Sequence, residues 1–148
     1  MTEEAREILR QHDEVNAYEF PRNFDYKALE RRASIVEGRL NEECGELTKF
    51  EGALYNQDAS FSVAVCLHGH ERSMGQGICL PSIRFSNFGS LVSITWPELI
   101  PSERLESIVR ILKAEGFTFV PQDELDCPYD GVMSGKFESW WIRYFDWL

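Results

Sequence analysis

A cysteine and two histidines alternate in the middle of the chain as Cys66-x-His68-x-His70, with Glu71 directly after them. If a β-strand continues through His70, the three side chains share one face, because residues two apart in a strand point the same way. Zn²⁺ accepts a thiolate and two imidazoles as ligands, and Glu71 or water would complete the set. A metal-dependent enzyme is therefore one hypothesis for the function. A solvated loop that merely contains histidines explains the same residues, since Gly69 interrupts the strand.

The segment 68–77, HGHERSMGQG, holds three glycines and has no hydrophobic period. It predicts a mobile loop, and such a loop can close over a small molecule. The segment contains neither a P-loop nor a dinucleotide-binding fingerprint, so phosphate binding would depend on Arg72 and main-chain amides. A small-molecule binding module is thus a second alternative.

Four carboxylates gather in the irregular segment 121–136: Asp123, Glu124, Asp126 and Asp130. Their spacing does not match a calcium-binding EF-hand loop, and no GxSxG or comparable motif predicts a nucleophile, so we assign no catalytic residue. An acidic segment of this kind can recruit a basic surface on another protein. We expect these carboxylates to bind a partner, with Trp147 as an aromatic anchor, because tryptophan is enriched at binding hot spots.

The composition narrows the class of partner. With 25 acidic and 15 basic residues, the net charge is −10, which opposes binding to nucleic acid or to an anionic membrane. No apolar run approaches the ~20 residues that a membrane span requires. The four cysteines form no CxxC pair and are typical of reduced thiols in the cytoplasm. We expect a cytoplasmic protein of one domain, and a basic protein or a small molecule as partner.

The clearest structural signal is a predicted β-hairpin over 78–96. Its buried face would consist of alternate residues: Ile83, Phe85, Val92, Ile94 and Trp96. Cross-strand partners share a face, so this register requires an even number of residues in the loop. Gly89 would supply a positive φ in that loop.

Other patterns predict the elements around this hairpin. Apolar spacings of three and four predict helices over 3–16, 26–44, 103–115 and 140–148, the first three capped by Thr2, Asp25 and Ser102. Alternating residues predict strands over 47–55, 61–67 and 117–120. His12 falls on the apolar stripe of the first helix and is expected to pack in the core, whereas Arg143 and Asp146 are expected to project away from the apolar face of the last helix. The fold class is α+β: a single domain over 1–148, with a four- to five-stranded antiparallel meander packed by helices.

The last nine residues, WWIRYFDWL, and the pattern PxxELDxPYDG over 121–131 resemble the ends of small uncharacterised bacterial α+β proteins. In size, acidity and lack of a catalytic motif, the chain is also similar to bacterial immunity proteins, which bind and neutralise a toxin domain. That resemblance implies a non-enzymatic, immunity- or adaptor-like protein that binds a basic partner. We take this as the leading hypothesis for the function, ahead of an enzyme with zinc at Cys66, His68 and His70 and of a small-molecule module.

Overall fold

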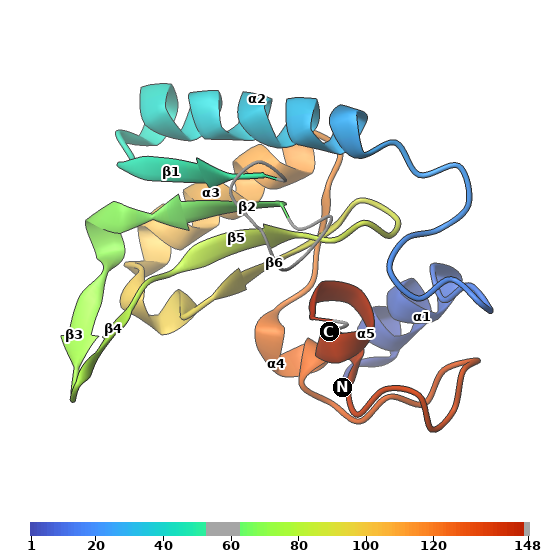
Figure 1. The fold of residues 1–148 in the computed structure, drawn as a ribbon. Coiled ribbons are helices and arrows are strands. Elements are labelled where there is room, and N and C mark those ends of the chain that lie inside the picture. Colours follow the sequence, from blue (N-terminus) through green and yellow to red (C-terminus); the bar gives the residue numbers. More distant parts are fainter. Residues whose placement is uncertain (53–62, 147–148) are drawn as a thin grey trace.

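A five-stranded sheet forms the centre of the computed structural model, which describes residues 1–52 and 63–146 (Figure 1). The strand order is β1-β2-β5-β6-β7, with bounds Thr48–Glu51, Val63–Leu67, Ser82–Phe85, Leu91–Thr95 and Thr118–Phe119. The first four strands are antiparallel neighbours, which confirms the predicted meander. The fifth, β7, runs parallel to β6 because a helix crosses over between them. The sheet is therefore mixed, not purely antiparallel.

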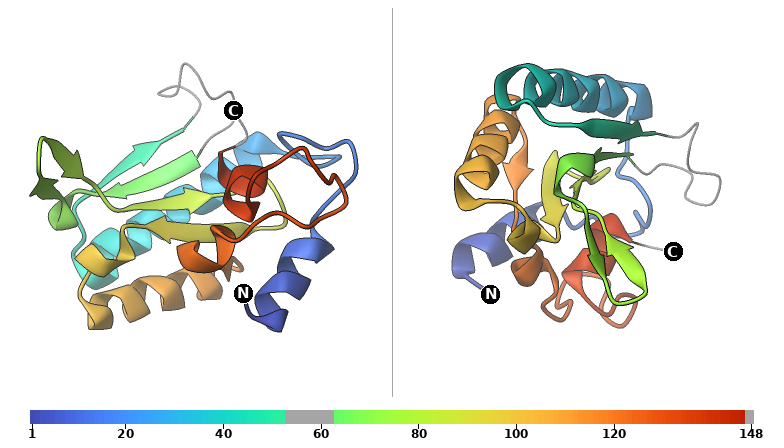
Figure 2. Two further views of the ribbon diagram at one scale, coloured as in Figure 1. Left: turned by 90° about the horizontal axis from the view of Figure 1, so that it is seen from below. Right: turned by 90° about the vertical axis from the view of Figure 1, so that its left-hand side faces the viewer.

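Two long helices, α2 (Tyr26–Cys44) and α3 (Ser102–Ala114), pack against one face of the sheet (Figures 1 and 2). The alternating residues predicted for this face do face the helices, since Ile83 pairs with Ile94 and Phe85 with Val92. Asp25 caps α2 by accepting a hydrogen bond from the Ala28 amide. Ser102 begins α3 rather than capping it, because Pro101 occupies the position before the first turn.

The loop between β5 and β6 has the predicted even length. The Ser86 amide donates to the Leu91 carbonyl, which leaves residues 87–90 as the loop. Gly89 has a φ of 56° there, and a Cβ at this position would overlap the imidazole of His12. His12 is half-buried in this contact, so it packs against the loop but is not the core residue that was expected.

Three short helices meet at one end of the sheet: α1 (Glu3–Gln11), α4 (Gln122–Leu125) and α5 (Trp140–Phe145) (Figure 1). They enclose a second core that includes Leu9, Phe88, Leu125, Trp140 and Tyr144. As predicted, Thr2 caps α1 by accepting from the Ala5 amide. The predicted extension of this helix to residue 16 is wrong, because α1 ends at Gln11 and Asp13 turns into a buried ion pair with α5.

Two predictions about side-chain direction are also wrong. Trp96 is 42% exposed, because its left-handed backbone, with a φ of 52°, turns the chain out of β6 into the 3₁₀ helix η2 (Pro97–Leu99). Arg143 is fully buried, since its guanidinium has an acidic partner inside the second core. Asp146 is exposed, as expected.

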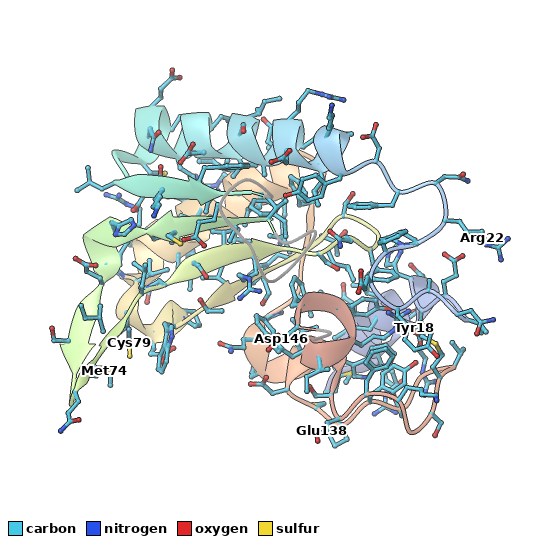
Figure 3. All side chains as sticks on the ribbon, in the orientation of Figure 1. Tyr18, Arg22, Met74, Cys79, Glu138 and Asp146 are labelled. Atoms are coloured by element: carbon cyan, nitrogen blue, oxygen red, sulfur yellow. The ribbon has the colours of Figure 1, made fainter. Side chains whose placement is uncertain are left out.

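The glycine-rich segment forms a projecting hairpin, so the prediction that it is a loop is wrong. After the 3₁₀ helix η1 (His68–His70), β3 (Arg72–Met74) pairs with β4 (Gly77–Cys79) around a turn at Gly75. This hairpin extends away from the main sheet (Figures 1 and 2). Met74 and Cys79 lie on it, at the opposite end of the view from Tyr18 and Arg22 (Figure 3). Within the described residues, no helix is both long and apolar enough to cross a membrane.

Candidate functional site

The proposed zinc ligands are not assembled into one site. Strand β2 ends at Leu67, as predicted, and His68 already belongs to η1, so the condition that the strand continue through His70 is not met. Cys66 is buried in β2, and burial, with a smaller effect from Glu51, raises the pKa of its thiol to about 11. Among residues 1–52 and 63–146, no three His, Cys, Asp or Glu side chains are placed to hold a metal ion.

His70 instead belongs to a buried charged cluster around Glu46, whose side chain is 1% exposed. The Nε2 atom of His70 lies 2.9 Å from Glu46 Oε1, and Arg104 donates to the same oxygen over 2.8 Å. Arg104 also donates to the Cys44 carbonyl. Glu46 lies between α2 and β1 and Arg104 lies on α3, so the cluster joins these two parts of the chain. The contact with Glu46 holds the His70 side chain in this cluster. His68 lies apart from it, 3.7 Å from Glu71.

The acidic segment 121–136 divides into two pairs of residues. Glu124 accepts a hydrogen bond from the Thr2 amide, and Asp130 forms ion pairs with Arg6 and Arg10 at 2.8 and 3.0 Å. These two carboxylates therefore hold α1 in place. Asp123 and Asp126 are exposed. The predicted anchor Trp147 lies outside the described residues.

Asp123 and Asp126 border a surface groove of about 460 Å³ between α3, α4 and the end of β6. Its apolar lining comes from five side chains: Ile94, Pro97, Leu105, Phe119 and Pro121. Its acidic rim comes from Glu98, Asp123 and Asp126, beside Gln122. We call this hollow the acidic groove.

Local sequence explains how α4 presents its two carboxylates. Pro121 ends the segment after β7 and precedes the first residue of α4, where its missing N–H costs no helical hydrogen bond. Leu125 is fully buried in the second core, while Glu124 holds the Thr2 amide. Leu125 thus faces the interior and Glu124 faces the start of α1, whereas Asp123 and Asp126 lie on the exposed side of α4 beside the groove.

Three carboxylates surround the acidic groove. None of Glu98, Asp123 and Asp126 forms an ion pair with a residue that the structure describes. Carboxylates of one sign around a low-dielectric floor raise the local concentration of cations. Leu105 and Phe119 are only partly buried, so the floor offers apolar contact area. An apolar floor within a charged rim fits a protein side chain with basic neighbours.

Sequence reasoning identified only part of this site. Asp123 and Asp126 were among the candidates, whereas Glu98, Leu105 and Phe119 were not. The separation of 25 positions between Glu98 and Asp123 conceals their proximity, because the two residues come together only when α3 crosses over and β7 pairs with β6.

No protein-family model, curated protein or solved structure matches the chain.

Proposed function

We propose that this protein is a non-enzymatic module that binds another protein through the acidic groove. The observation that carries this proposal is the placement around an apolar floor of three carboxylates that form no ion pair with a described residue. Such a site favours a partner segment in which an aromatic or aliphatic side chain is flanked by lysine or arginine. The partner would be a basic protein of the cytoplasm, which agrees with the net charge of −10 and with the resemblance to immunity proteins.

Two observations favour binding over metal-dependent catalysis. Cys66 is a buried thiol with a raised pKa, which disfavours the thiolate that zinc or nucleophilic chemistry requires. His70 lies beyond the end of β2, and its Nε2 atom is within hydrogen-bond distance of the Glu46 carboxylate. The residues proposed for the enzyme hypothesis are therefore held by separate structural contacts.

Selection from a random peptide display library tests the proposal and does not require the partner to be identified. The immobilised full chain should enrich peptides that combine an apolar anchor with lysine or arginine. The variant Asp123→Lys/Asp126→Lys should lose at least about tenfold in affinity for these peptides, because two attractive pairs become repulsive. A matched control, Glu42→Lys/Glu138→Lys, makes the same change in net charge at exposed positions that do not line the groove.

The control variant should bind the selected peptides nearly as well as the wild type. A selection that enriches no peptide would overturn the proposal. It would equally be overturned by peptides that bind the groove variant and the wild type with the same affinity.

A further inference from the structure

The acidic groove continues along α3 into a second hollow of about 410 Å³. The two hollows share Leu105 and Phe119, and Val109 extends the apolar floor one helical turn further. All three side chains are partly buried hydrophobic residues that pack on the main core from outside. The two hollows therefore form one elongated apolar surface, which we call the composite groove.

The far end of the composite groove has the opposite charge. Arg110 and Lys113 line it and are exposed, and neither forms an ion pair with a residue in the described ranges. Glu106 lines the same hollow, so two cations face one carboxylate and the local balance is positive. Leu105 and Lys113 are eight positions apart on α3, a rise of about 12 Å. The reversal of charge thus occurs within the length of one short peptide segment.

We infer that the composite groove binds a bipolar segment of its protein partner. The basic end of that segment would lie against Glu98, Asp123 and Asp126, its apolar middle on Leu105 and Phe119, and its acidic end against Arg110 and Lys113. This inference rests on the proposed function and narrows it, since a uniformly basic segment would place like charges together at the α3 end. Repulsion between like charges weakens the binding of segments with a different charge pattern and fixes the register in which a matching segment binds.

Two synthetic peptides with the same apolar middle test the inference. The bipolar peptide carries two lysines at one end and two glutamates at the other, and the bi-basic peptide has lysines in all four positions. Titrations are made near 0.15 M salt, where the Debye length of about 8 Å limits the long-range attraction of any cation to an acidic protein. The wild type should bind the bipolar peptide about fivefold or more tightly than the bi-basic one.

The variant Arg110→Glu/Lys113→Glu should reverse that preference. A matched control, Lys27→Glu/Arg31→Glu, makes the same change in net charge at exposed positions of α2 and should keep the preference of the wild type. A bi-basic peptide that binds the wild type as tightly as the bipolar one, yet loses affinity for Asp123→Lys/Asp126→Lys, would overturn the bipolar inference and leave the proposed function standing. Failure of both peptides to bind would overturn the two together.

Discussion

Arg143 and Asp13 form an ion pair that is closed to solvent, with side chains 0% and 1% exposed. The Nε of Arg143 donates to Asp13 Oδ1 over 2.8 Å, although 130 positions separate the two residues. The second oxygen of Asp13 accepts from the Tyr129 hydroxyl and the Val132 amide. The pair ties the segment after α1 to α5, and so closes the second core that also holds Leu125 of α4.

Replacement of one member of this pair should destabilise the protein strongly. Arg143→Met leaves the Asp13 carboxylate buried without its counter-charge, which costs about 3–5 kcal/mol in comparable pairs. Urea unfolding measures the loss. The double variant Asp13→Leu/Arg143→Met should be more stable than Arg143→Met, because no unpaired charge remains. A single variant within about 0.5 kcal/mol of the wild type would contradict the structural role of the pair.

The imidazole of His12 should make stability depend on pH. Burial lowers its pKa from the ordinary value of 6.5. The unfolded chain therefore takes up a proton at higher pH than the folded protein does, so the free energy of unfolding should fall as the pH drops below about 6.5. Well above that pH, His12 is neutral in both the folded and the unfolded protein, so its burial then costs no deprotonation and stability is not reduced.

Unfolding of the wild type and of His12→Gln at pH 7.5 and 5.5 measures this effect. The variant keeps the side chains of His68 and His70 and removes only the imidazole of His12. The decrease in unfolding free energy between the two pH values should be smaller in His12→Gln. Equal decreases would show that burial of this imidazole has no energetic consequence.

Cys66 should resist thiol reagents in the native protein. Burial raises the pKa of its thiol to about 11 and keeps the sulfur from solvent. Ellman's reagent at pH 8 should give the same native count of reactive thiols in the wild type and in Cys66→Ser, and one fewer in the variant in urea. Because the folded pKa lies above the ordinary value of 9.0, this thiol should also cost stability as the pH rises from 9 towards 11. Rapid native labelling of Cys66 would instead support the hypothesis of a metal-dependent enzyme.

Glu46 should contribute to stability through its charge. Glu46→Gln keeps the shape of the side chain but weakens the hydrogen bonds with His70 and Arg104, and hydrogen bonds to charged groups contribute about 1.5–3 kcal/mol. We expect a loss of about that size in thermal or urea unfolding. The matched control Glu42→Gln, at an exposed position of α2, should change stability by less than about 0.5 kcal/mol. Equal effects of the two substitutions would contradict the role of the cluster.

Local patterns predicted the sheet because its register follows from burial. A slip of one residue would move Ile83 or Ile94 to the other face, so alternation limited the pairing to registers that keep both residues on the buried face, and the observed pairing is one of these. The end of α1 was not predictable in this way. Its helical pattern continues towards residue 16, but contacts of Asp13 with α5, at the other end of the chain, end the helix at Gln11.

The candidate site was predictable only in part for a similar reason. Neighbouring carboxylates in one short segment have different roles, since Glu124 and Asp130 are bound by α1 while Asp123 and Asp126 border the groove. The sequence contains no sign of which carboxylates a distant helix will neutralise. The apolar floor of the groove could not be predicted from the sequence either, because Leu105 lies on the same face of its helix as fully buried residues.

Amide chemical-shift mapping of a selected peptide on the isotope-labelled protein would locate the binding surface directly. We expect the largest shifts around Glu98, Leu105, Phe119 and Asp123, with no comparable change in the Arg72–Cys79 hairpin. Shifts that gather on that hairpin or around His68 and His70, with the groove unchanged, would contradict the proposal that the acidic groove binds the partner.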